Sequence, residues 1–285
     1  MGRSIFKANS SSNQIMVYEP PVGRLKSINW RELWDYRELL YFLTWRDVKV
    51  RYKQAALGVA WAILQPLFTM IIFSVIFGSL VKVDSEGIPY PVFSFAALLP
   101  WQFFSGALSR AGGSLVMNNN LLTKIYFPRL VIPLSAVGAG LVDFGISFVV
   151  LLGLMLVYGI TPTWAVLTLP FFILLSAMAA LAVGLWLSAL NVQYRDVQYL
   201  IPFIVQVWMY ASPVVYSAQV VPQGLGRIIY GLNPMAGVIE GFRWALLGTQ
   251  PPDLLFLVSV AVVIVLLITG LIYFRQMEES FADIV

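Results

Sequence analysis

Cysteine and histidine are both absent from this chain of 285 residues. The lack of cysteine excludes a disulfide framework. The lack of histidine removes the commonest metal ligand and the side chain that most often carries protons near neutral pH. We expect no metal site, catalytic residue or cofactor in the chain, and nucleic acid is not among its expected partners.

Charge is also scarce. Only 11% of the residues are charged and 59% are hydrophobic, with a mean hydropathy of +0.81. Soluble domains carry about 25% charged residues. A chain this apolar cannot cover itself with polar surface, so we expect a lipid bilayer to be its solvent.

A nucleotide-binding loop of the form G-x-x-x-x-G-K-[ST] is missing too, and no Gly-Lys pair occurs anywhere in the chain. Energy for any transport would therefore come from an ion gradient or from another protein. Residues 1–56 are polar and basic, without a short apolar core, so we expect no cleavable signal peptide.

Six apolar segments have the length of about 20 residues that a membrane-spanning helix needs. We predict an all-α membrane protein with transmembrane helices at 57–81, 92–117, 130–160, 164–190, 197–217 and 254–274. Of the 18 lysines and arginines, only Lys82, Arg227 and Arg243 would lie outside if the N-terminus were cytoplasmic. The positive-inside rule thus predicts that both termini are cytoplasmic.

The N-terminal part divides into two segments. Residues 1–28 are expected to be a flexible cytoplasmic tail, and 29–56 an amphipathic helix in the headgroup layer, with Leu33, Tyr36, Leu40 and Leu43 on one face. This helix ends in the basic cluster Arg46, Lys49, Arg51 and Lys53. The cluster either anchors the topology or binds a pyrophosphate group through charge-assisted hydrogen bonds.

Two connecting segments are more apolar than ordinary loops. The first, 118–129, is predicted to form a short cytoplasmic helix whose exposed apolar face contacts a protein partner, or else a plain connector. Its candidate contact residues are Leu121, Leu122, Lys124, Ile125 and Tyr126. The second, 219–250, is predicted to form two short helices on the outer side, as a re-entrant pair or an external cap.

Several residues of 219–250 stand out. Asn233 followed by Pro234 predicts a helix N-cap with proline at the first helical position. Glu240 and Arg243 are three residues apart on one predicted helix, a spacing that favours an ion pair between them.

Aromatic and amide side chains share one side of two predicted spans: Trp61, Gln65 and Phe68 in the first, and Tyr199, Phe203, Gln206 and Tyr210 in the fifth. Aromatic rings stack on sugar faces, and amides hydrogen-bond hydroxyls. These stripes either line a sugar-conducting channel or pack against other helices. Asp143, inside the third span, is either a proton site or a structural acid paired with an arginine.

Three stretches together resemble the transmembrane subunit of ATP-binding-cassette polysaccharide exporters, which transport O-antigen, capsular polysaccharide or teichoic acid. They are "WRDVKVRYKQAALGVAWAILQPL" (45–67), "LLPWQFFSGALSRAGGSLVMNNNLLTKIYFPR" (98–129) and "NVQYRDVQYLIPFIVQVWMYASPVVY" (191–216) followed by "LNPMAGVIEGFRWALLG". The resemblance covers nearly everything from about residue 30 onward.

The resemblance implies a homodimeric channel in the bacterial inner membrane and two copies of a separate ATPase that binds ATP and magnesium. It implies an undecaprenyl-diphosphate-linked glycan as substrate, with O-antigen as the leading choice. Residues 118–129 would be the coupling helix, Arg195 and Asp196 a coupling loop, and Asn233, Pro234, Glu240 and Arg243 part of the outer gate. The alternatives are an ion-coupled secondary transporter, or a permease for teichoic acid or capsular polysaccharide.

Overall fold

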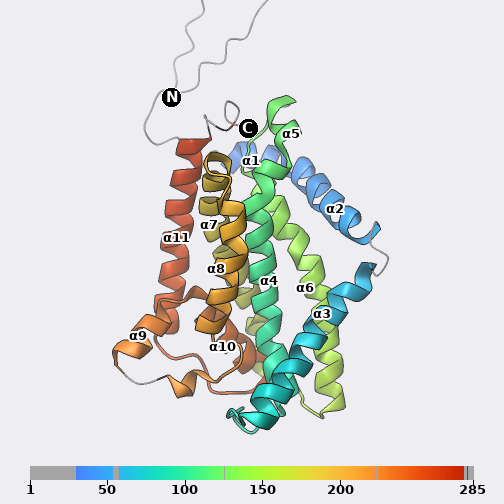
Figure 1. Cartoon of the computed structure of the whole chain (residues 1–285), viewed down its shortest axis with the longest axis vertical. Coiled ribbons are helices and arrows are strands. Elements are labelled where there is room, and N and C mark those ends of the chain that lie inside the picture. The colour runs from blue at the N-terminus through green and yellow to red at the C-terminus, as the bar shows by residue number, and fades with distance from the viewer. Residues whose placement is uncertain (1–29, 54–57, 125, 222–223, 279–280, 282–285) are drawn as a thin grey trace, which may run out of the picture.

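The computed structural model describes residues 30–53, 58–124, 126–221, 224–278 and 281. All regular structure in these residues is helical, as the sequence predicts (Figure 1). The longer helices are α2 (Arg37–Lys53), α3 (Gly58–Phe73), α4 (Tyr90–Met117), α6 (Val131–Val157), α7 (Leu169–Gln193), α8 (Val197–Ala211), α10 (Pro234–Leu247) and α11 (Phe256–Met277). The short ones are α1 (Trp30–Asp35), α5 (Asn119–Lys124) and α9 (Leu225–Gly231). A π-helical turn extends α3, and 3-10 turns precede α7 and α9.

Five of the described helices are long and apolar enough to cross a membrane. They are Ala60–Leu80, Tyr90–Met117, Val131–Val157, Trp164–Gln193 and Phe256–Met277. Each overlaps a predicted span. The remaining predicted span, 197–217, is shorter than predicted: its helix has 15 residues and ends at Ala211.

Proline explains where α8 ends. The residue before a proline is pushed into extended conformation, and Ser212, before Pro213, has φ −105° and ψ 150°. At about 1.5 Å per residue, a helix of this length is about 22 Å long, less than the bilayer core of about 30 Å. Residues that follow Ala211 therefore continue as non-helical backbone.

The centre of the molecule is α4, which contacts α3, α6, α7, α8 and α10. Small residues let its neighbours approach. A Cβ at Gly184 of α7 would lie 2.7 Å from the Cβ of Ala111, and one at Gly112 of α4 would lie 2.8 Å from Ile201 of α8. Close backbone approach of this kind is the usual basis of helix packing in membranes.

The segment before the first span is two helices, α1 and α2, broken at Tyr36 rather than continuous as predicted, and it has two different apolar faces. One face, which includes Leu43 at 2% exposure and Val48 at 5%, packs into the protein, mainly on α6. The other exposes aromatic side chains: Trp34, Tyr41, Phe42 and Trp45. Aromatic rings with a polar edge suit the interfacial layer of a bilayer. In Figure 1, α1 and α5 lie at the same end of the bundle, and α9 lies toward the opposite end.

Candidate functional site

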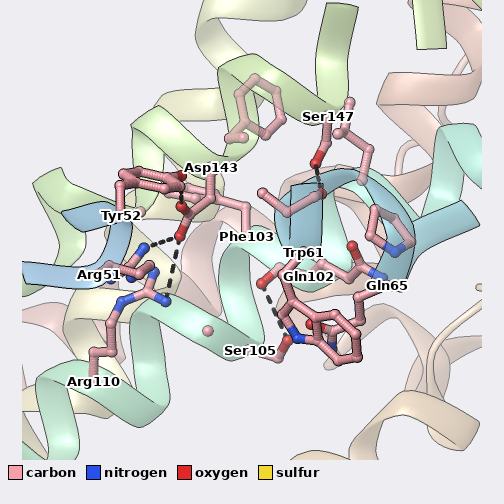
Figure 2. Close-up of a pocket in the computed structure, with 16 residues that line it drawn as sticks. Arg51, Tyr52, Trp61, Gln65, Gln102, Phe103, Ser105, Arg110, Asp143 and Ser147 are labelled. Atoms are coloured by element: carbon pink, nitrogen blue, oxygen red, sulfur yellow. Dashed lines mark hydrogen bonds and ion pairs between the residues drawn. The ribbon is translucent and has the colours of Figure 1, made fainter. Parts of the chain in front are cut away.

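A cavity of about 570 Å³ opens between α2, α3, α4 and α6 (Figure 2). It has a charged end and a neutral polar end. The charged end holds Arg51 and Tyr52 of α2, Arg110 of α4 and Asp143 of α6. The neutral end is lined by Trp61 and Gln65 of α3, Gln102 and Ser105 of α4, and Ser147 of α6.

Asp143 is the hub of the charged end. Its carboxylate accepts hydrogen bonds from the Arg51 guanidinium and the Tyr52 hydroxyl, and Arg110 Nη1 lies 3.7 Å from Oδ2. The pairing with an arginine that the structural alternative for Asp143 requires is therefore present, from Arg51 of α2 and Arg110 of α4. Burial, and then the hydrogen bond to Asp143, raise the pKa of Tyr52 to about 12.

Arg110 lies within the predicted span 92–117, but sequence reasoning did not assign it to the site. The structure places it inside α4, between two glycines. A Cβ at Gly106 would lie 3.1 Å from Nη1 of Arg110, and one at Gly140 would lie 2.5 Å from Nη2. A cation within a segment long enough to span the membrane was the available signal.

Two of the three predicted channel residues of the first span, Trp61 and Gln65, line the cavity. Phe68 does not line it and is 57% exposed. Gln102 stands beside Trp101 and Phe103 in the predicted second span, where an amide among aromatic rings suits a sugar, and it lines the cavity. Sequence reasoning did not assign Ser105 and Ser147 to the site, because their contribution depends on how α4 and α6 pack.

The predicted stripe of α8 lies apart from this cavity. Tyr199, Phe203, Gln206 and Tyr210 are all exposed in the single chain, Tyr199 by 75%. The opposite face packs inward, with Ile201 buried and Val205 and Trp208 against the core. The stripe thus forms one continuous outward face that the chain itself does not cover.

The four residues of the basic cluster are not gathered around the cavity. Arg46 pairs with Asp47 and donates to Asn118 Oδ1 at 2.8 Å. Lys49 Nζ lies 5.5 Å from the Trp45 ring centroid, and Lys53 is exposed. Only Arg51 of the four reaches the cavity.

Only some of the predicted coupling residues are exposed. Leu122 is buried at 6% exposure in a cluster with Leu43 and Leu115, so the expected exposure of this side chain is wrong. Leu121 is half-buried, Lys124 is exposed, and Tyr126 is 78% exposed. Ile125 lies outside the described residues. Arg195 and Asp196 are exposed in the turn between α7 and α8.

The residues predicted to lie on the outer side form two separate networks. Asn233 caps α10 as predicted, with Oδ1 accepting from Met235 N at 3.0 Å and from Trp208 Nε1 at 2.9 Å. Its Nδ2 donates to Ser212 Oγ, which ties the end of α8 to the start of α10. Pro234 is the first residue of α10.

The predicted Glu240–Arg243 ion pair is wrong. Arg243 is buried and donates to three backbone carbonyls, those of Phe93, Val214 and Tyr216. Glu240 instead accepts from Tyr230 Oη at 2.7 Å. Helical spacing allowed the pair, but the carbonyls left without helix partners after Ala211 attract the guanidinium.

Comparisons with known proteins agree with the all-helical membrane fold. The family model of the ABC-2 type transporter matches residues 38–247. The O-antigen export system permease protein RfbA of Myxococcus xanthus is 33% identical over 256 residues, covering 89% of this chain and 97% of that protein. RfbA of Klebsiella pneumoniae is 30% identical over 249 residues, 87% of this chain and 95% of that protein. The polysialic acid transport protein KpsM of Escherichia coli is 26% identical over 245 residues, 82% of this chain and 92% of that protein. The chain therefore belongs to the ABC-2 type transporter family.

Proposed function

We propose that this chain is the channel-forming permease subunit of an ATP-driven exporter in the bacterial inner membrane. Its substrate is a polysaccharide carried on undecaprenyl diphosphate, with O-antigen as the leading choice. The cavity is the observation that carries the proposal, because it joins guanidiniums to an indole, amides and hydroxyls. Such a lining suits a glycan with an anionic end. The names of the curated relatives, which specify O-antigen export and polysialic acid transport, support the same substrate class.

A homodimer is part of this proposal. The aromatic and amide face of α8 is left uncovered by the chain, as is Trp61 of α3 at 56% exposure. A second copy would place two such faces around one path. A mid-membrane amide such as Gln206 needs a polar partner, which a hydrated, sugar-filled channel supplies.

The energy comes from a separate ATPase, present in two copies on the cytoplasmic side, where both termini also lie. The supporting observation is the missing nucleotide-binding loop. The purified chain alone is expected to hydrolyse no ATP. Vesicles that hold the chain with its ATPase should hydrolyse ATP faster when the lipid-linked glycan is added. Hydrolysis by the chain alone, or no stimulation by glycan, would contradict the proposal.

The exposed part of the 118–129 segment and the α7–α8 turn are the proposed ATPase contacts. We expect Lys124→Glu combined with Tyr126→Glu to lower co-purification of the ATPase severalfold, because both side chains are solvent-exposed and can enter a partner surface. Leu122→Asp is expected to fail differently, by destabilising the fold, since a carboxylate would enter a buried cluster.

The measurement is the ratio of ATPase to permease after affinity purification. Lys82→Glu, which makes the same lysine-to-glutamate change on the opposite side of the predicted topology, serves as the control. An unchanged ratio in the Lys124/Tyr126 variant, with normal yield, would remove this segment from the proposed interface.

A further inference from the structure

The charged end of the cavity holds more positive charge than Asp143 can neutralise. Two guanidiniums, those of Arg51 and Arg110, face one carboxylate. Each guanidinium offers five N–H donors, whereas the carboxylate has two oxygens, one of which also accepts from Tyr52. The Nε of Arg110 is buried and finds no acceptor among the described residues. The site therefore has donors to spare for a second anion.

Two glycines leave space for the Arg110 guanidinium at this place. Gly106 lies one helical turn before it on α4, and Gly140 faces it from α6; a Cβ at either position would crowd the guanidinium. A long cationic side chain in a membrane helix normally extends toward the interface. Here the two glycines make room for the guanidinium beside the cavity (Figure 2).

The rest of the cavity limits what the anion can be attached to. Trp61 offers a ring face, Gln65 and Gln102 offer amides, and Ser105 a hydroxyl, all on the neutral side in Figure 2. A volume of about 570 Å³ falls within the range typical of small-molecule sites. The lining therefore suits a hydroxylated ring joined to a phosphoryl group, because guanidiniums bind phosphoryl oxygens in pairs.

We propose that Arg51 and Arg110 form the subsite for the phosphoryl group of a glycosyl diphosphate, and that Asp143 is the resident anion which this group must displace. The inference rests on the proposed function and deepens it. The carboxylate keeps the guanidiniums in place while the cavity is empty. It also sets a threshold for binding, because a ligand must compete with it.

Displacement of Asp143 also affects a contact between two helices, α2 and α6. Asp143 of α6 holds both Arg51 and Tyr52, which are neighbours on α2. When a phosphoryl group takes over Arg51, this contact between the interfacial helix and α6 is released. Binding at the cavity and the position of α2 are therefore linked through one carboxylate.

The test measures binding of undecaprenyl diphosphate to the full chain in phosphatidylcholine nanodiscs, without the ATPase. We expect Asp143→Asn to bind about tenfold more tightly, and Arg110→Gln about tenfold more weakly, as is typical for gain or loss of one charge-assisted hydrogen bond. Tyr52→Phe removes one of the bonds that retain Asp143 without changing charge. It should tighten binding by about twofold to threefold and covers the case in which Asp143→Asn does not fold.

Matched controls separate the subsite from general charge effects. Asp253→Asn frees Arg227 from an ion pair outside the cavity, and Arg37→Gln removes a positive charge from the same helix as Arg51. Neither should change the affinity by more than about twofold. Weaker binding in both Asp143→Asn and Tyr52→Phe would overturn the displacement, and unchanged binding in Arg110→Gln would overturn the subsite.

The source of the phosphoryl group is decided by competition. Phosphatidylglycerol added to the nanodiscs should compete only weakly, and inorganic pyrophosphate should compete at high concentration. Equal competition by phosphatidylglycerol would overturn the glycosyl diphosphate and assign an ordinary lipid headgroup. The proposed function fails separately: it does so if glycan does not stimulate ATP hydrolysis in the reconstituted complex, whatever these affinities are.

Discussion

Replacing Arg243 by methionine is expected to cost at least about 3 kcal/mol of stability, a large part of what keeps a typical domain folded. The guanidinium is 3% exposed and lies 3.6 Å from the centroid of the Phe93 ring. It donates to the carbonyls of Val214 and Tyr216 at 2.9 Å and to that of Phe93 at 3.3 Å. Methionine fills similar space but removes the donor from the carbonyls of Val214 and Tyr216, which lie outside the helices, and the loss of such a bond to a charged group costs about 1.5–3 kcal/mol each.

The measurement is the melting temperature and the monodisperse yield in detergent. Arg243→Lys should be intermediate, because a single ammonium keeps the charge but cannot match the planar fork of donors. Arg195→Met, in an exposed turn, is the matched control and should stay within about 0.5 kcal/mol. Wild-type stability in Arg243→Met would show that these carbonyls find other donors.

The second large effect is expected in thiol labelling of α8. Because the chain has no native cysteine, single substitutions can be probed without background. Phe203→Cys, Gln206→Cys and Tyr210→Cys should react with a membrane-impermeant thiol reagent when the exporter is turning over, since these positions are exposed in the chain. Ile201→Cys and Val205→Cys, on the packed face, should react at least about tenfold more slowly, as opening of packed helices is costly.

If α8 lines a channel, a second result is expected for the same variants. Translocating glycan should slow labelling at the three exposed positions and leave the two packed ones unchanged. If the exposed positions label at the same rate with and without glycan, the stripe is only hydrated. If none of them labels in any state, the face is sealed by lipid or by a partner helix.

The distribution of long apolar segments along the sequence was enough to predict most of the fold. The five long helices follow from their apolar length, with Arg110 and Asp143 as interruptions in α4 and α6, and Asn233 caps α10 because its side chain can satisfy a local N–H. The end of α8 was also readable in principle, since Pro213 acts on its immediate neighbour. The prediction of a span at 197–217 gave more weight to the apolar composition of the segment than to Pro213.

The site was less predictable because it depends on which helices meet. Arg51 and Asp143 are 92 positions apart, and only the packing of α2 on α6 joins them. The place of Arg110 in the site was not predicted for the same reason, because it depends on Gly140 of another helix. The spacing of three residues on one helix predicted the wrong partner for Arg243. Its burial near unpaired backbone carbonyls outweighs the neighbouring carboxylate of Glu240.

The uncovered face of α8 has a consequence for how such a sequence can change over time. Tyr199, Phe203 and Tyr210 are exposed in the chain, so replacing them removes little that holds a single subunit together. The demands of folding a single subunit are therefore weak at these positions. If the face lines the proposed channel, the bundle can stay the same while this row of side chains adapts to a new polymer.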